Sequence, residues 1–208
     1  MATTDPIRDR SQLGELAGYW LRRNNFRNYA LIVLGVNTAL RISDLLQLMW
    51  VDVFDEKRGA FCSHIILEER KTGKQKAIAL NSHSTDALRL YLPHRRGEYI
   101  FAGNRRDAAP ISRVQAWRIV RAAACTINAA GNIACHSLRK TFGYHAWANG
   151  ASPVLLMDIY NHSHYETTRR YLGISQDDRD KVYMGLRLFS EPNRTLLECL
   201  DRCGRMEA

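Results

Sequence analysis

Residues 51–80 interrupt a chain whose other segments carry helical patterns. Three runs rich in Val, Ile and Phe, at 51–54, 60–67 and 75–80, are separated by turn sequences at 55–59 and 71–74. Such runs between turn residues are typical of strands joined by hairpins. The pattern predicts a three-stranded antiparallel meander with a hairpin tip at 71–74. Because helices flank it on both sides, we expect an α+β fold that is mostly α-helical.

Apolar spacing and capping residues define the helices. Ser43 and Ser112 are expected N-caps, Pro153 is expected to start a helix, and Gly131 and Gly150 are expected to end helices. The predicted helices cover 12–24, 29–40, 43–50, 84–92, 112–130, 138–149, 153–160, 167–172, 177–189 and 194–203.

Positive charge is concentrated in the middle of the chain. The formal net charge is +9, and residues 57–121 carry 14 basic against 5 acidic side chains. Arginine supplies 24 of the 30 cations, and its guanidinium binds phosphate oxygens in a bidentate manner. The distribution predicts a polyanionic partner, nucleic acid before a membrane surface. The alternative is a solvated basic face.

Several other classes of protein are disfavoured. No run approaches the roughly 18 apolar residues of a membrane span, and the first ten residues lack a secretory pattern. Five scattered cysteines with no CxxC pair indicate reduced thiols in a cytosolic protein. Metal-binding and nucleotide-binding motifs are absent from the sequence, so we expect chemistry without metal or nucleotide cofactor.

Two clusters suit the binding of a phosphate. Arg41 stands at the start of a predicted helix, and Asp44, three residues on, could orient its guanidinium. His136 and Arg139 share one face of a later helix. The arginine should lower the pKa of the histidine, which favours a neutral imidazole able to accept a proton. A surface ion pair and a structural histidine are the plainer explanations.

Two further clusters offer a nucleophile and an acid. Residues 162–171 contain two His, two Tyr and two Arg. Cationic donors beside a tyrosine can stabilise its phenolate and a developing phosphorane, and residue type alone does not choose between Tyr165 and Tyr171. Lys71, at the predicted hairpin tip, could reach into a groove and donate a proton to a leaving oxygen. An ordinary turn lysine is the alternative.

In this order, the four clusters resemble the tyrosine recombinase (phage integrase) family over about residues 27–173. The most specific part is residues 136–141, His-Ser-Leu-Arg-Lys-Thr, followed by His162 and by Tyr171 nine residues later. Residues 38–50 resemble the first-arginine motif of the family, and residues 69–74 are similar to its β-hairpin lysine motif.

The resemblance implies the recombinase catalytic fold and site-specific DNA recombination through a 3′-phosphotyrosyl intermediate, without metal or ATP. Arg41, Arg139 and His162 would bind the scissile phosphate. His136 would act as a base or as a further phosphate ligand, and Lys71 as the general acid. Tyr171 would be the nucleophile, and Asp44 would support Arg41.

The expected partner is double-stranded DNA with a specific recombination site, bound by a homotetramer, with a directionality factor or a second recombinase as further candidates and no membrane. A nucleoid-associated location in a bacterial, plasmid or phage context follows. Integration, excision, resolution and inversion all remain open. The candidate DNA contacts are Lys74, Arg105, Arg106, Arg113, Arg118, Arg121 and Lys140.

We expect an N-terminal extension at 1–25, a catalytic domain at 26–175 and C-terminal helices at 176–208. Leu196, Leu197 and Leu200 form an apolar stripe that packs either on the chain's own core or on a neighbouring protomer.

Two features depart from the family pattern. Tyr160 and Asn161 stand where most members have Leu-Gly, although Asn tolerates a positive φ. Only about 25 residues precede the helix predicted at 29–40, where most members carry a core-binding domain. Two alternatives therefore accompany the main hypothesis: a DNA-binding accessory protein that keeps the fold, and a type IB topoisomerase.

Overall fold

The computed structural model describes residues 4–68, 75–104, 108–174 and 176–186. The chain divides into two compact units, Met1–Gly173 and Ile174–Ala208. The second unit contains α9 (Gln176–Gly185), and the first contains the other elements. The helices of the first unit are α1 (Arg10–Leu21), α2 (Phe26–Asn37), α3 (Ile42–Leu45), α4 (Ser82–Tyr91), α5 (Arg113–Thr126), α6 (Cys135–Ala148), α7 (Pro153–Tyr160) and α8 (Tyr165–Leu172).

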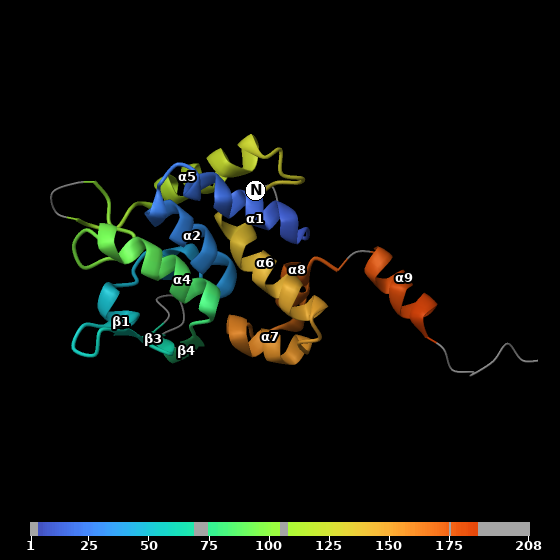
Figure 1. The fold of residues 1–208 in the computed structure, drawn as a ribbon. Coiled ribbons are helices and arrows are strands. Elements are labelled where there is room, and N and C mark those ends of the chain that lie inside the picture. Colours follow the sequence, from blue (N-terminus) through green and yellow to red (C-terminus); the bar gives the residue numbers. More distant parts are fainter. Residues whose placement is uncertain (1–3, 69–74, 105–107, 175, 187–208) are drawn as a thin grey trace, which may run out of the picture. The chain divides into compact units, whose positions relative to one another are not determined.

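Helix α2 lies at the centre of the first unit. Helices α1, α4 and α6 pack against it (Figure 1). Leu31 and Leu34 belong to a core cluster that includes Leu88 of α4. Ile32 belongs to a second cluster, which includes Leu16 of α1 and residues of α5 and α6. Because α2 is apolar on most of its faces, it can serve both clusters at once.

The strand region differs from the predicted three-stranded meander. The strands are β1 (Phe54–Asp55), β2 (Ala60–Phe61), β3 (His64–Glu68) and β4 (Gln75–Ala79), and they form two antiparallel pairs, β1–β2 and β3–β4. Cys62 and Ser63 divide the expected middle strand. The Cys62 amide donates to Val53 O at 2.9 Å, whereas Ser63 O accepts from Leu80 N at 2.9 Å. The middle segment therefore changes partner at this point.

The helix predicted at 43–50 is mostly wrong. Helix α3 ends at Leu45, and a 3-10 turn covers Trp50–Asp52. The backbone between them bonds to a distant segment, because Trp50 N donates to Glu98 O and Ile100 N donates to Leu48 O. Tertiary hydrogen bonds thus replace the helical ones. The N-cap of α3 is Arg41, not Ser43.

Several other helix ends agree with the predicted capping residues, but α5 ends at Thr126 and not at Gly131. The Ser112 hydroxyl accepts from Gln115 N at 3.2 Å at the start of α5. Pro153 begins α7 as predicted, with Ser152 as its N-cap. Helix α6 begins at Cys135, three residues before the prediction, and so includes His136 in its first turn.

Residues 4–8, named here the N-terminal strap, lie across α6. Ile7 N donates to Thr141 Oγ1 at 2.9 Å, and Ile7 O lies 3.0 Å from His145 Nε2. Arg8 donates to Gly173 O at 2.6 Å, immediately after α8. Ile7 is 1% exposed. The strap therefore connects the first residues of the unit to α6 and to the end of α8.

Two glycine substitutions test the close packing of α2 on α6. A Cβ on Gly35 would lie 2.6 Å from Leu138 Cδ1, whereas one on Gly14 of α1 meets nothing within 4 Å. The same Cβ would lie 3.2 Å from Leu138 Cβ, and Leu138 is 1% exposed, so the buried side chain has little room to adjust. We expect Gly35→Ala to lower the free energy of unfolding by about 1–3 kcal/mol, and Gly14→Ala to raise it by about 0.5–1 kcal/mol. Urea denaturation measures the change in the free energy of unfolding for each variant. Changes of the same sign in the two variants would contradict the close packing of α2 on α6.

Candidate active site

Arg41 is positioned by the turn that starts α3. Its carbonyl accepts hydrogen bonds from Asp44 N and Leu45 N, both at 2.9 Å. The Arg41 guanidinium lies 4.0 Å from Asp44 Oδ2, and the Asp44 side chain is 3% exposed. A buried carboxylate at this distance orients the guanidinium electrostatically. The partially exposed Arg41 side chain, with 20% of its surface accessible, stays within reach of a bound anion.

Arg139 connects three segments of the site. Its side chain is buried, with the residue 1% exposed. One terminal nitrogen donates to Ala39 O and the other to Tyr160 O, the latter at 3.0 Å. Ala39 has a φ of 54°, a conformation that costs a non-glycine residue about 1–3 kcal/mol. The bond from Arg139 helps to hold this turn, which leads directly into Arg41.

His136 is kept neutral by its surroundings. Its pKa is lowered from the ordinary 6.5 to about 4, first by burial of the ring and then by the charges of Lys140, Arg139 and Arg41. The ring lies edge-on to Tyr171, with centroids 4.9 Å apart. The predicted direction of the shift is thus confirmed, with burial as its largest cause. A neutral imidazole beside a phenol can accept a proton.

His162 follows α7 in a turn that depends on Asn161. Asn161 adopts the left-handed conformation, with φ 51° and ψ 46°, which asparagine tolerates better than most residues. His162 Nδ1 lies 3.0 Å from Thr168 Oγ1. This contact fixes the orientation of the ring, since Thr168 belongs to α8 and is 0% exposed.

Tyr171 lies among the other candidate residues. It belongs to the last turn of α8. Its ring centroid lies 4.9 Å from that of His162 and 5.7 Å from the Cζ of Arg139. Tyr165 begins the same helix and is 41% exposed. The structure therefore brings Tyr171, together with Arg139, His136 and His162, into one cluster formed by α6, α7 and α8.

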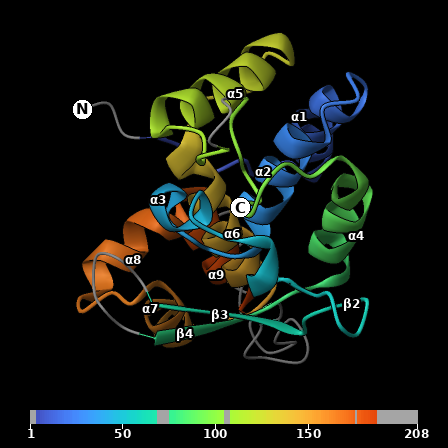
Figure 2. The same cartoon turned by 90° about the vertical axis from the view of Figure 1, so that its left-hand side faces the viewer.

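Lys71 and Lys74 lie outside the described residues, as do Arg105 and Arg106. The strands next to Lys71 are placed: β3 pairs with β4 in the register His64 with Ala79 through Glu68 with Gln75. The Lys76 ammonium of β4 donates to Ile159 O at 2.5 Å. The hairpin is thus attached to α7 one residue before Tyr160, and Figure 2 shows it beside α7.

The remaining DNA-contact candidates separate into two groups. Arg113 and Arg118 are exposed on α5, while Arg121 is half-buried and donates to Ile133 O at 3.2 Å. Lys140 is a correction to the sequence prediction. It is 5% exposed, its ammonium donates to Thr4 O at 2.5 Å, and burial lowers its pKa. This lysine holds the N-terminal strap and faces away from solvent.

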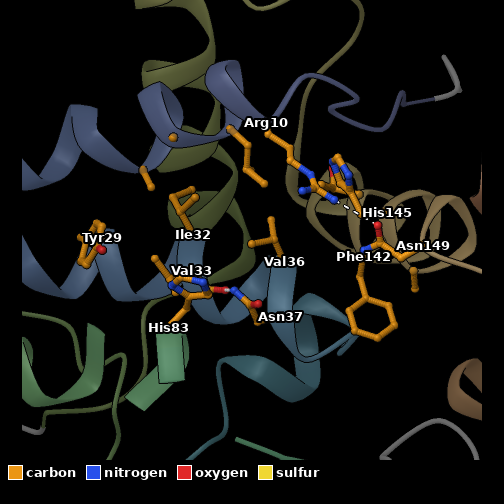
Figure 3. Close-up of a pocket in the computed structure, with 15 residues that line it drawn as sticks. Arg10, Tyr29, Ile32, Val33, Val36, Asn37, His83, Phe142, His145 and Asn149 are labelled. Atoms are coloured by element: carbon orange, nitrogen blue, oxygen red, sulfur yellow. Dashed lines mark hydrogen bonds between the residues drawn. The ribbon is translucent and has the colours of Figure 1, made fainter. Parts of the chain in front are cut away.

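A pocket of about 700 Å³ lies elsewhere, between α1, α2 and α6. Its walls are largely apolar, with Ile32, Val33 and Val36 pointing into it and Arg10, His145 and Asn149 at its edge (Figure 3). The predicted catalytic residues do not line it. Among the residues that the structure describes, three or more His, Cys, Asp or Glu side chains nowhere gather as a metal site would require. The described helices are also too short or too polar to cross a bilayer.

A family model, described as the phage integrase family, matches residues 10–177. The chain belongs to the phage integrase family. The probable integrase/recombinase YoeC of Bacillus subtilis is 38% identical over 186 residues, which cover 88% of this chain and 97% of YoeC. The tyrosine recombinase XerD of Halalkalibacterium halodurans is 25% identical over 167 residues, which cover 76% of this chain and 53% of XerD. The chain thus spans about half the length of that XerD.

Solved structures of two recombinases share the fold. The XerA recombinase matches with a TM-score of 0.72 at 20% identity, over 90% of this chain and 67% of that one. The XerH recombinase in a post-cleavage complex with difH DNA matches with a TM-score of 0.71 at 17% identity, over 88% and 53%. The family model and YoeC confirm the predicted tyrosine recombinase family, and the solved structures confirm the mostly helical α+β fold.

The sequence argument missed Tyr160. This residue is 0% exposed and lies between Arg139, His162 and Tyr171. The one available signal was its position, directly before Asn161 and His162 and at a departure from the family pattern.

The low pKa of His136 predicts an acid-sensitive fold. A histidine with a lower pKa in the folded protein binds fewer protons there than in the unfolded chain. Its contribution to stability is therefore complete above pH 6.5 and is lost as the pH falls toward about 4. We expect the His136 ring to titrate near pH 4 by NMR, and the His136→Gln variant to lose less stability than the wild type between pH 6.5 and 4. A titration midpoint at or above 6.5 would contradict this description.

Proposed function

We propose that this recombinase cleaves and rejoins DNA at a specific site with Tyr171 as its nucleophile. The observation that carries the proposal is the position of Tyr171, whose ring lies within 4.9 Å of His136 and of His162, centroid to centroid. The Tyr171 oxygen attacks the scissile phosphorus, and the bond from phosphorus to O5′ breaks. The products are a 3′-phosphotyrosyl bond and a free 5′-hydroxyl. Attack by another 5′-hydroxyl reverses the step, so the phosphodiester energy is conserved and ATP is not consumed.

The neighbouring residues provide proton transfer and stabilisation of charge. His136, neutral at physiological pH, accepts the phenolic proton. Arg41 and Arg139 stabilise the charge that develops on the phosphoryl oxygens, and His162 donates to one of them. Such fixed donors in a partly buried site lower the barrier more than the same groups would in water. Lys71 protonates O5′, and the attachment of its hairpin to Ile159 O supports this role.

The exposed apolar side chains of α9 support assembly of a tetramer on DNA. Val182, Tyr183 and Met184 are 71%, 78% and 84% exposed. Three large apolar side chains exposed on one short helix favour contact with another protein surface. We infer that residues 176–208, with the stripe of Leu196, Leu197 and Leu200, pack on a neighbouring protomer. Sedimentation of the DNA complex measures the number of protomers.

A trapped covalent adduct tests the nucleophile. The recognition site is first selected from fragmented genomic DNA and is then prepared as a nicked suicide duplex. We expect the wild type and the Tyr165→Phe variant to form an adduct on this DNA that survives denaturation. The Tyr171→Phe variant should bind the duplex equally well and form none, because it lacks the attacking oxygen.

The same experiment separates the alternatives. Specific binding by the wild type with no adduct would indicate an accessory protein. Relaxation of a supercoiled plasmid without the selected site would indicate a topoisomerase. Recombination only after addition of a second protein would show the need for a directionality factor or a partner recombinase. An adduct with the Tyr171→Phe variant would refute the assignment.

The salt dependence of binding tests the basic face of α5. A protein cation that contacts a phosphate releases condensed counterions, which changes the slope of log K against log salt by about 0.9 per contact on duplex DNA. We expect Arg118→Ala to reduce the slope on a random duplex by about 0.9. Arg89→Ala is the matched control, because Arg89 already pairs with Asp86 at 2.6 Å. An unchanged slope in the Arg118→Ala variant would remove α5 from the DNA interface.

A further inference from the structure

Tyr160 contacts three of the residues that were assigned a role above, although it has no assigned role itself. The Arg139 Cζ lies 4.6 Å from the centroid of its ring. The His162 ring stacks on it at 5.1 Å with an interplanar angle of 20°. The Tyr171 ring lies 5.0 Å away at 43°. One side chain therefore touches the proposed nucleophile and two of the proposed phosphate ligands.

We propose that Tyr160 is a positioning residue, whose buried ring fixes Arg139, His162 and Tyr171 relative to one another for cleavage of DNA. The inference rests on the proposed function. The one polar group of the Tyr160 side chain, its hydroxyl, already donates to Arg139 O, so Tyr160 acts through the residues that it contacts. Placement matters because an error of about 1 Å in a reacting group can cost about 100-fold in rate.

Tyr160 is itself held by reciprocal bonds to Arg139. The Tyr160 hydroxyl donates to Arg139 O at 2.8 Å, and the Arg139 guanidinium donates to Tyr160 O at 3.0 Å. Burial raises the pKa of Tyr160 above its ordinary value, and nearby Tyr171 adds to the effect while Arg139 opposes it. The hydroxyl therefore stays protonated and remains a donor. These bonds connect the end of α7 to the middle of α6.

The surface of α6 accommodates this tyrosine closely. A Cβ on Gly143 would collide with Tyr160 Oη, so the absence of a side chain at 143 leaves room for the hydroxyl. Phe142 lies edge-on to the ring, with centroids 6.3 Å apart and an interplanar angle of 80°. The aromatic face also holds the guanidinium by a cation–π contact. The ring therefore has neighbours on several sides that keep it in one orientation.

Three variants separate positioning from general stability. Tyr160→Phe keeps the ring and removes the hydroxyl. Tyr160→Leu removes the ring, and Tyr160→Met replaces it with a flexible side chain if the leucine variant does not fold. Phe101→Leu is the matched control, because Phe101 is also 0% exposed but belongs to the core cluster around α2 and α4.

The first measurement needs no DNA. In the free protein, the nuclear Overhauser effect between the His136 and Tyr171 rings reports their 4.9 Å centroid separation, and neither ring is substituted. We expect this signal in the wild type, in Tyr160→Phe and in Phe101→Leu, and its loss in Tyr160→Leu. A folded Tyr160→Leu protein that keeps the signal would overturn the proposal.

The second measurement is the single-turnover rate of adduct formation on the suicide duplex. We expect a decrease of about 100-fold in Tyr160→Leu with DNA affinity unchanged, and rates near that of the wild type in Tyr160→Phe and Phe101→Leu. An equal decrease in Phe101→Leu would show a general stability effect and would also overturn the proposal. If the wild type forms no adduct, the proposed function fails, and the first measurement alone decides the role of Tyr160.

Discussion

The buried guanidinium of Arg139 is the interaction on which the site depends. It bonds to Ala39 O, before Arg41, and to Tyr160 O, before His162. Two loops that are 121 residues apart in sequence are thereby joined through one side chain of α6. A lysine could not replace it, because a single ammonium lacks the planar pair of donors that reaches both carbonyls. Leaving either carbonyl unpaired in this buried region would be costly.

The same charges that organise the site also set its chemistry. Burial of its ring and the cations Lys140, Arg139 and Arg41 lower the pKa of His136 and keep its imidazole neutral, as the proposed base requires. Lys140 contributes charge from within the fold while its ammonium secures the N-terminal strap. The strap reaches the end of α8 through Arg8. The same residues therefore contribute to the stability of the first unit and to the protonation state of the site.

Sequence reasoning identified the residues of the cluster because their types and order are distinctive. It chose Tyr171 over Tyr165 only through the family pattern, and the geometry now supports that choice by the position of the ring. It also anticipated the turn at Asn161, since asparagine adopts a positive φ with little strain. Local rules were sufficient at the helix starts marked by Ser112 and Pro153, but they failed at the cap expected at Ser43.

Predictions from local sequence failed where hydrogen bonds to distant backbone segments determine the secondary structure. The helix expected at 43–50 ends early because Leu48 and Trp50 bond to the segment around Glu98 and Ile100. The expected middle strand divides because its two ends pair with different partners. Lys140 was expected to contact DNA, and Tyr160 was noted only as a departure from the family pattern. Only the packing of α6 against the strap and against α7 reveals what each contacts.

The most direct test of the account is a crystal structure of the recombinase with its selected DNA site, divided at the scissile bond, in the presence of orthovanadate. We expect a vanadium atom bonded to Tyr171 Oη and to the adjoining DNA oxygens. Arg41, His136, Arg139 and His162 should each lie within hydrogen-bond distance of the vanadate or of its Tyr171 oxygen. Vanadate held by a different side chain, or these four residues directed to separate surfaces around it, would contradict the central claim.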